Sequence, residues 1–353
     1  MATVPHSLRE VLIRVSDVGE FGLIARISAA LAKGLEEQPG GSAGGPRRAG
    51  DHVIVGIGDD AAVLRAPDAR TVATMDVLVE GRHFRRDWSG PRDIGRKAAA
   101  QNLADVAAMG AVPTALLVGF AAPASLEVSW AEGFATGLAA EAARAGAAAV
   151  GGDVSAAEAI MIAVTALGDL EGRPPVTRSG ARPGDIVAVA GPLGRSAAGL
   201  ALLLAGLGRA AGTEALISAH RRPQPPYEAG PEAAHLGATA MIDVSDGLVA
   251  DLGHVARASG ADISVRTAAL ECGRDLRAAA DLIVTADAPH PDPLHWILTG
   301  GEDHALAATF PPGTVLPGHW SVIGEVAERE GSGGRVLVDG EPYAADPGWD
   351  HFR

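Results

Sequence analysis

Aspartates recur in this chain beside glycines, where short apolar runs end. In the first case, residues 53–64 read VIVGIGDDAAVL, and the apolar run leads through Gly-Ile-Gly to Asp59 and Asp60. A glycine-lined turn lets a ligand approach the backbone closely. Two adjacent carboxylates are costly unless solvent or a cation compensates their charge. Because Gly and Asp are also ordinary turn residues, this segment alone indicates either a solvated turn or a cation site.

Five further aspartates occupy comparable positions, at the ends of predicted strands or on the apolar side of a predicted helix. They are Asp76, Asp105, Asp153, Asp243 and Asp246. Side-chain oxygens gathered without cysteine select hard cations, Mg²⁺ before Zn²⁺. Mg²⁺ held by a few carboxylates usually also binds substrate phosphates. The set therefore predicts phosphoryl transfer assisted by cations.

Asp105 lies in a predicted helix over residues 91–110. Ile94, Ala98, Asn102, Asp105 and Met109 follow one another at helical steps, so they share one face, which is otherwise apolar. A carboxylate on the buried side of a helix needs a partner. No Lys or Arg stands three or four positions from Asp105. The partner is then either a distant arginine or a metal ion.

The common nucleotide-binding motifs are missing. There is no GxxxxGK[ST], HRD or DFG sequence, and the only lysines are Lys33 and Lys97, so a P-loop lysine is not available. Any bound ATP must rely on aspartate-held metals and arginine.

Residues 186–207 are predicted to form a strand, a GPLGRS turn and a helix. This turn either holds a phosphate or only packs the helix on the sheet. Ser245 or Asp246 either caps the helix over residues 248–259 or helps its amides to bind an anion.

Composition limits the class of protein. The chain has 353 residues, 47% of them hydrophobic, and a net charge of -14, which disfavours a nucleic-acid partner. The one cysteine, Cys272, excludes an intrachain disulfide and a CxxC zinc site. No apolar stretch is long and continuous enough for a signal peptide or a membrane span. We expect a cytoplasmic protein without a membrane partner.

The order of predicted elements indicates an α/β fold. Residues 53–167 alternate as two strands, helix, strand, helix and two strands, after a helical N-terminal stretch and a Gly/Pro-rich loop at 34–51. Composition shifts to Pro, Gly and Arg at 169–183, which is typical of a domain boundary. Strands and helices alternate again after it, with an extended connector at 221–232. We expect two α/β domains, residues 1–172 and 173–353.

The chain resembles the thiamine-monophosphate kinase family. The resemblance rests on GIGDDAAVL, TMDVLVEGRHF, NLADVAAMGA, GGD, TRSGARPGD, GPLGRSAAGL, IDVSDGL, TGGEDHAL and the terminal GWDHF, which occur in the family's order over almost the whole chain. It implies the two-domain fold of aminoimidazole-ribonucleotide-synthetase-like proteins and a homodimer joined through the N-terminal sheets. Alternatives are another ATP-dependent synthetase of this fold, of the purine-biosynthetic type, or a nucleotide-binding regulator without turnover.

The same resemblance implies roles for individual residues. Several Mg²⁺ ions would be held by Asp60, Thr74, Asp76, Asp105, Asp153, Asp243 and Asp246. Met75 stands where the family often has a second hydroxyl residue, so it would serve only through its backbone carbonyl. ATP would contact Gly152, Asp153, Arg178 and Ser245, and thiamine monophosphate would contact His83, Glu302 and Trp349.

The implied reaction joins two phosphates. The acceptor phosphate has a second pKa of about 6. It is therefore already an anionic nucleophile at neutral pH, and no general base is expected. Two unit charges about 4 Å apart repel by about 4 kcal/mol at an effective dielectric constant of about 20. Mg²⁺ and Arg178 would offset this repulsion. We therefore expect direct in-line transfer without a covalent enzyme intermediate.

Overall fold

The computed structural model describes residues 13–36, 50–57, 61–283, 291–329, 334–343 and 348. The predicted ligand Asp60, its neighbour Asp59, the predicted substrate residue Trp349 and most of the loop at 34–51 lie outside this part of the chain.

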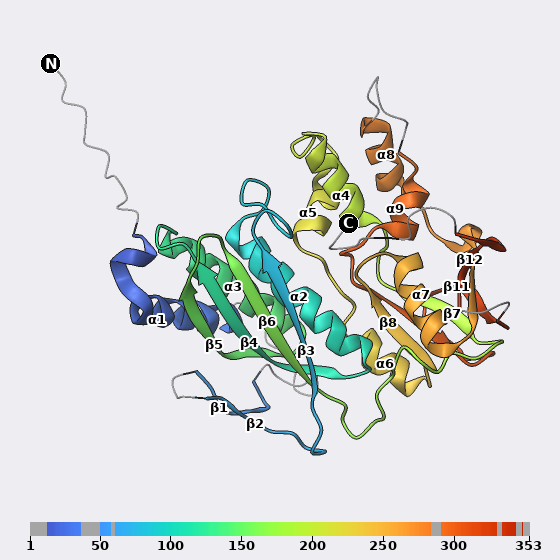
Figure 1. Cartoon of the computed structure of the whole chain (residues 1–353), viewed down its shortest axis with the longest axis horizontal. Helices are drawn as coiled ribbons and strands as arrows, with labels where there is room; N and C mark the ends of the chain where they lie inside the picture. The colour runs from blue at the N-terminus through green and yellow to red at the C-terminus, as the bar shows by residue number, and fades with distance from the viewer. Residues whose placement is uncertain are drawn as a thin grey trace.

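The N-terminal half is built on a four-stranded sheet with the order β3-β6-β4-β5. Its strands are β3 (Val72–Val79), β4 (Val112–Ala122), β5 (Ala148–Ala156) and β6 (Met161–Asp169). β4 and β5 are parallel, and the other pairs are antiparallel. Helices α2 (Pro91–Ala108) and α3 (Val128–Arg144) cover one face, and α1 (Val15–Glu36), kinked at Gly19, packs on α3 (Figure 1).

Alternation along β3 decides which side chains reach these helices. Thr74, Asp76 and Leu78 are more buried than their neighbours and face α2, because Leu78 belongs to the main core and Thr74 bonds to the helix. The residues between them point to the other face. The strand continues past Asp76 to Val79, and β5 likewise continues past Asp153. Both aspartates therefore lie inside strands, and the prediction that they follow strand ends was wrong.

The opposite face of this sheet is open and apolar. Met75, Val77, Leu117 and Met161 are 59%, 37%, 37% and 46% exposed there, in neighbouring rows of the register. The short pair β1 (Val53–Val55) and β2 (Val63–Leu64) packs over one end of this face, against Ala115, Ala148 and Val150. A contiguous exposed patch of this kind usually marks an interaction surface.

The C-terminal half contains a seven-stranded sheet in the described residues, with the order β13-β12-β9-β11-β7-β10-β8. Its strands are β7 (Ile186–Ala190), β8 (Ala240–Val244), β9 (Asp262–Val265), β10 (Ala305–Phe310), β11 (Trp320–Ala327), β12 (Val336–Val338) and β13 (Glu341–Pro342). The accompanying helices are α4 (Arg195–Leu204), α5 (Glu214–Arg221), α6 (Ala229–His235), α7 (Leu248–Ser259), η1 (Thr267–Ala269), α8 (Arg274–Ile283) and α9 (Pro293–Thr299). β7 and β10 are buried along their length because both faces of the sheet are covered.

The two halves share one hydrophobic core. Met241, Leu306 and Phe310 of the second sheet cluster with Ile94 and Leu103 of α2. The other face of that sheet packs with α4, α7 and α9 in a separate core. Helix α2 is thus covered by a sheet from each half (Figure 1).

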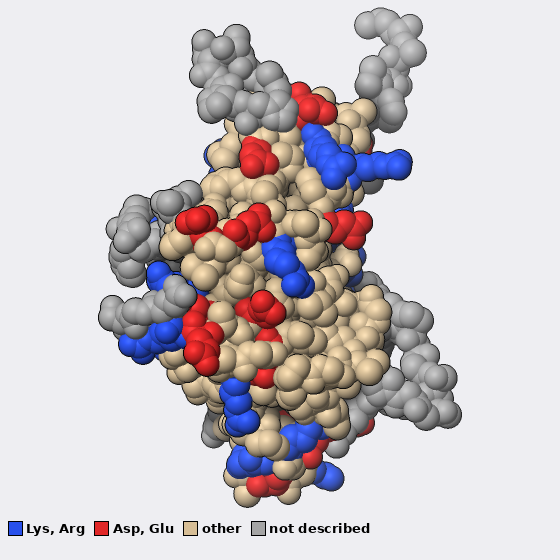
Figure 2. Space-filling view, turned by 90° about the vertical axis from the view of Figure 1, so that its right-hand side faces the viewer, with Lys and Arg blue, Asp and Glu red and all other residues tan. Residues whose placement is uncertain are grey.

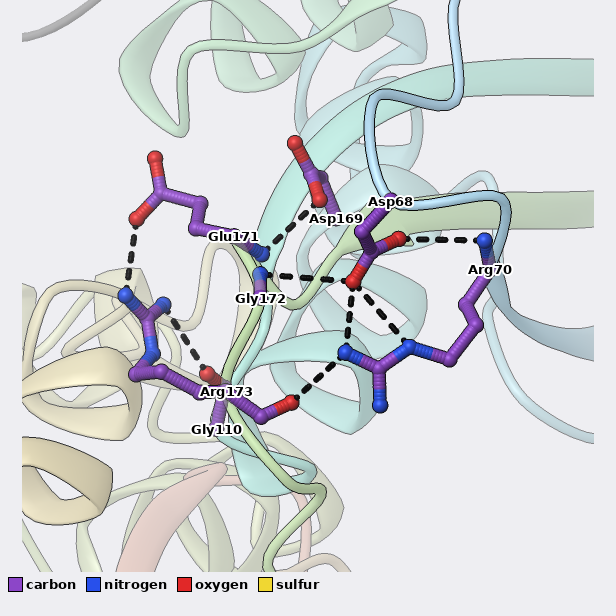
Figure 3. A network of polar contacts seen from close by, with 7 residues as sticks. All are labelled: Asp68, Arg70, Gly110, Asp169, Glu171, Gly172 and Arg173. Atoms are coloured by element: carbon purple, nitrogen blue, oxygen red, sulfur yellow. Dashed lines mark hydrogen bonds and ion pairs between the residues drawn. The ribbon is translucent and has the colours of Figure 1, made fainter.

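Polar contacts fix the chain where it passes from one half to the other (Figure 3). Asp68 accepts hydrogen bonds from Arg70 and from the Gly172 amide, and Arg70 also donates to the Arg173 carbonyl at 3.1 Å. Arg173 in turn pairs with Glu171 and donates to the Gly110 carbonyl at the end of α2. The first sheet ends at Asp169 and the next strand begins at Ile186, so the predicted division at residue 172 falls between them and stays a prediction.

The predicted α/β fold class is confirmed, and the predicted helix at 248–259 matches α7. The predicted connector at 221–232 was partly wrong, because α6 begins at Ala229. Pro231 falls in its first turn, where no backbone donor is needed.

None of the described helices is long and apolar enough to cross a membrane. Figure 2 views the molecule from the side of the C-terminal half and shows basic and acidic side chains interspersed over this face.

Candidate active site

Three of the predicted aspartates come together where the two halves meet. Asp76 lies on β3, Asp105 on α2 and Asp243 on β8. Burial, together with the charges of Asp243 and Asp76, raises the pKa of Asp105 to about 7. The Thr74 hydroxyl donates a 2.8 Å hydrogen bond to Asp105 Oδ2, which opposes part of that rise. A buried carboxylate that two neighbouring carboxylates repel is a place where a cation would bind.

Asn102 holds the strand and the helix of this cluster together. Its Oδ1 accepts from the Asp76 amide at 2.9 Å, and its Nδ2 donates to the Ala98 carbonyl at 2.9 Å. The side chain is fully buried, and an amide with both ends bonded fixes its own orientation. The sequence placed Asn102 on the same face as Asp105 without assigning it this role.

Asp243 is paired with His304, which the sequence did not single out. His304 Nδ1 lies 3.2 Å from Asp243 Oδ2, and both side chains are buried. Burial opposes protonation of His304, but the hydrogen bond with Asp243 and the charges of Asp243 and Asp105 outweigh it and raise the pKa of the imidazole. Glu302 and His304 both have positive φ, 65° and 53°, a strained conformation that is concentrated at functional sites.

Asp251 orders the loop that carries Ser245 and Asp246. Its Oδ2 accepts from the backbone amides of Ser245, Asp246 and Gly247 at 3.0, 3.0 and 3.1 Å. Asp251 lies in the first turn of α7, so its carboxylate also interacts well with the helix dipole. Its burial and the nearby Asp243 raise its pKa to about 8. The N-cap of α7 is Gly247, without a side-chain cap hydrogen bond, so neither Ser245 nor Asp246 is the predicted cap, and Asp251 instead holds the loop that precedes the helix.

A second polar group lies around Lys97, eight positions before Asp105 on α2. Lys97 Nζ is 2.8 Å from Glu302 Oε1 and donates to the His83 carbonyl at 3.4 Å. His83 Nδ1 accepts from the Val79 amide at 3.0 Å, so Nε2 carries the ring proton. Two of the predicted substrate residues, from different halves of the chain, thus meet at one buried lysine. Reasoning from the sequence used Lys97 only to exclude a P-loop.

The GPLGRS turn does not offer an open phosphate site at α4. Asp303 Oδ1 accepts from the Ser196 amide at 2.8 Å, and the Asp303 carboxylate also bonds to the amides of Arg195 and Gly194. The chain's own carboxylate therefore occupies the position that an anion would take. Of the two interpretations of this segment, the packing of a helix is the one that the structure favours.

Other predicted residues lie apart from the three aspartates. By register, Asp153 shares a row with Val77 and Gly119, so it lies on the open face, opposite to Asp76. The Met75 side chain is on that face too, which leaves only its backbone near Thr74 and Asp76. Gly152 permits close pairing of β5 with β4, since a Cβ there would be 2.0 Å from the Val118 carbonyl oxygen.

Arg178 lies on an exposed loop that is tied to α7. Its carbonyl accepts from the Ser259 hydroxyl at 3.2 Å, and Ser259 Oγ also accepts hydrogen bonds from the amides of Gly180 and Ala181.

At the other end of α7, a Cβ at Gly348 would lie 2.2 Å from the Asp246 carbonyl oxygen. Gly348, which directly precedes the predicted substrate residue Trp349 in the sequence, therefore lies against the Asp246 loop.

The donor set fits Mg²⁺ better than a transition metal. Within the described ranges, no three His, Cys, Asp or Glu side chains form a ready metal-binding group, and Asp60 lies outside those ranges. Mg²⁺ usually takes only one or two carboxylates and keeps waters or substrate phosphates as its other ligands. The oxygen-only contacts of Asp105 and its raised pKa match such an incomplete, phosphate-dependent site.

Comparisons with known proteins identify relatives of the whole chain. The family model for AIR synthase related protein, N-terminal domain, matches residues 58–170. Thiamine-monophosphate kinase of Mycobacterium tuberculosis is 47% identical, over 100% of this chain and 97% of that protein. The enzyme of Corynebacterium glutamicum is 39% identical, over 99% and 97%. The solved structure of AaThiL complexed with AMPPCP and TMP superposes with a TM-score of 0.74 at 34% identity, over 96% of this chain and 99% of that one.

Proposed function

The chain belongs to the thiamine-monophosphate kinase family, and from this premise we propose that it transfers the γ-phosphate of ATP to thiamine monophosphate, giving thiamine diphosphate and ADP. The observation that carries this proposal is the meeting of Asp76, Asp105 and Asp243, from both halves of the chain, beside a separate polar group at Glu302. The three aspartates suit phosphates with their cations, and the polar group at Glu302 suits the head group of a substrate.

We propose that Asp76, Asp105 and Asp243 hold Mg²⁺ together with Thr74, whose hydroxyl also fixes Asp105. The remaining proposed metal ligands are Asp60, the Met75 carbonyl, Asp153 and Asp246. Several Mg²⁺, when bound, would offset the charge of the two phosphate groups. Gly152, Asp153, Arg178 and Ser245 are the proposed contacts for ATP.

The head group of thiamine monophosphate is proposed to contact His83, Glu302 and Trp349. The ionised Glu302 can accept a hydrogen bond from the aminopyrimidine, and the His83 Nε2 proton can be donated to a ring acceptor. The acceptor phosphate needs no base from the protein, because it is already anionic near neutral pH. Direct in-line transfer follows, with the chain's residues placing the two phosphates.

We further propose a cytoplasmic homodimer in which the open faces of two four-stranded sheets meet. The exposed Met75, Val77, Leu117 and Met161 support this, because a patch of such side chains favours burial against a second copy. Residues 1–172 would then form the ATP, Mg²⁺ and dimerisation domain, and residues 173–353 would complete the substrate site. The cytoplasm supplies the ATP that the reaction consumes.

One assay tests the proposed function. Purified protein with ATP and Mg²⁺ is given thiamine monophosphate or an aminoimidazole precursor, and ADP release is measured. Release that depends on thiamine monophosphate supports the kinase. Release with the precursor would identify the purine-type synthetase, and ATP binding without release would identify a regulator. A phosphorylated residue trapped with ATP alone would overturn direct transfer.

A further inference from the structure

Lys97 is almost completely buried, although its charge would ordinarily keep it at the surface. Its side chain is 4% exposed, whereas that of its partner Glu302 is 36% exposed. The lysine therefore holds the carboxylate from inside and leaves part of it accessible. A buried ion pair alone is weak evidence for a stabilising role, because desolvation cancels much of the attraction. The geometry of the pair, with the lysine inside and the carboxylate partly exposed, instead suits a positioning role.

The contacts of Glu302 divide its two carboxylate oxygens. Oε1 is bound by Lys97 at 2.8 Å, and Oε2 lies 3.4 Å from His220 Nδ1. Burial and the nearby Lys97 lower the pKa of His220 to about 3, so the imidazole is neutral near pH 7. Of these two contacts, Lys97 is therefore the one that carries a positive charge and forms the ion pair with Glu302. Burial raises the pKa of Glu302, but the charge and the hydrogen bond of Lys97 oppose this and hold that pKa below its ordinary value.

The backbone at Glu302 also needs an external restraint. Its φ of 65° is unfavourable for a residue other than glycine. The Glu302 amide donates to the Ser245 carbonyl at 2.8 Å, which ties this strained turn to the loop of Asp243 and Asp246. The Lys97 ion pair fixes the side chain of the same residue from the opposite half of the molecule.

Helix α2 connects this group to the proposed metal site. Lys97 and Asp105 are eight positions apart on one continuous helix, a separation of about 12 Å along its axis. A rigid helix therefore sets the spacing between the group that Glu302 would bind and the carboxylates that would receive the phosphates.

We propose that Lys97 is a positioning residue for substrate selection: it orients ionised Glu302 toward the amino group of the substrate's pyrimidine ring and fixes the distance of that contact from Asp105. This inference rests on the proposed function. Lys97 itself touches no reacting atom. It also holds the His83 carbonyl at 3.4 Å, so both proposed ring contacts depend on it.

The test uses the full-length chain and two substrates, thiamine monophosphate and its analogue with oxygen in place of the pyrimidine amino group. We expect Lys97→Met to raise KM for thiamine monophosphate about tenfold or more and to reduce discrimination against the oxygen analogue by a similar factor. KM for ATP should change less than about twofold, as positions remote from a site act independently. Lys97→Arg should restore part of the discrimination. Lys33→Met, at an exposed position of α1, is the matched control.

A double-variant cycle separates positioning from a general loss of structure. If Lys97 acts through Glu302, then Lys97→Met should have little further effect in a Glu302→Gln background. Lys97→Gln, which keeps a buried donor, replaces Lys97→Met if that variant does not fold. Unchanged discrimination in folded Lys97 variants, or an equal effect in the Glu302→Gln background, would overturn the inference while the kinase proposal stands. If the unaltered chain releases no ADP with thiamine monophosphate, the proposed function itself fails.

Discussion

The Thr74 hydroxyl donates a 2.8 Å hydrogen bond to Oδ2 of Asp105, across 31 positions of sequence. It joins β3 to α2 at the point where the second half of the chain adds Asp243. The bond gives one oxygen of a crowded carboxylate a fixed direction, and it keeps Asp105 in place when no cation compensates the neighbouring charges. The same strand directs Met75 to the opposite face of the sheet.

Replacing Asp105 with Asn should abolish ADP release, because the variant loses a proposed cation ligand. The apo variant should be at least as stable as the parent chain, since a repelled, buried carboxylate has been neutralised. ADP release at high Mg²⁺ and thermal melting without Mg²⁺ measure the two effects. Asp339→Asn at a remote turn is the control. Retained turnover with a lowered melting temperature would make Asp105 a structural residue.

Thr74→Val should weaken the response to Mg²⁺ without abolishing activity. Valine has a similar shape but leaves Asp105 Oδ2 without its hydroxyl donor, at a cost of about 1–3 kcal/mol. The Mg²⁺ concentration for half-maximal ADP release should therefore rise about tenfold. Thr74→Ser keeps the donor and should remain near the parent value. Equal Mg²⁺ responses in both variants would show that the bond does not orient Asp105.

Asp251→Ala should destabilise the protein more than any surface substitution. Three backbone amides of residues 245–247 lose their acceptor, and we expect a loss of about 3 kcal/mol or more in the free energy of unfolding. Asp251→Asn retains one acceptor oxygen and should lose less. Denaturant unfolding at neutral pH checks the order of the two variants. If alanine and asparagine are equivalent, the three bonds are not what holds this loop.

His220 should make stability fall in mild acid. The folded pKa is about 3, below the value of about 6.5 expected in the unfolded chain. The unfolded state therefore binds the additional proton, and the stabilisation present above about pH 6.5 decreases as the pH falls. Between pH 7 and 5 the loss is about 2 kcal/mol.

The matched variant for this prediction is His220→Asn, which cannot titrate there. The difference in unfolding free energy between the parent and His220→Asn should shrink in favour of the variant as the pH decreases from 7 to 5. A constant difference across this range would show that His220 is protonated to the same extent in both states.

Met161→Asp should separate the proposed dimer. Met161 lies on the open sheet face with 46% of its surface exposed, so aspartate is tolerated by a single chain but would be buried, unpaired, against a second copy. Sedimentation of the parent and the variant measures the molecular mass in solution. Val315→Asp, at a position 86% exposed, controls for added charge. A parent chain that sediments as a monomer would contradict the proposed interface.

The sequence by itself determined the fold class, the family and most elements near the site. Helical spacing placed Asn102 and Asp105 on one face of α2, because periodicity reports which side of an element is buried, and an apolar run located β7. The lack of a P-loop lysine and the repeated aspartates indicate cation-assisted phosphoryl transfer from the sequence alone.

Only the tertiary structure decided which of these residues meet. Alternation along strands sends Asp76 and Asp153 to opposite faces, and a short motif does not reveal where such a strand ends. Lys97 pairs with Glu302 across more than half of the sequence, and His304 pairs with Asp243 across neighbouring strands. Such contacts depend on how α2 packs between two sheets, a long-range arrangement that local spacing does not encode.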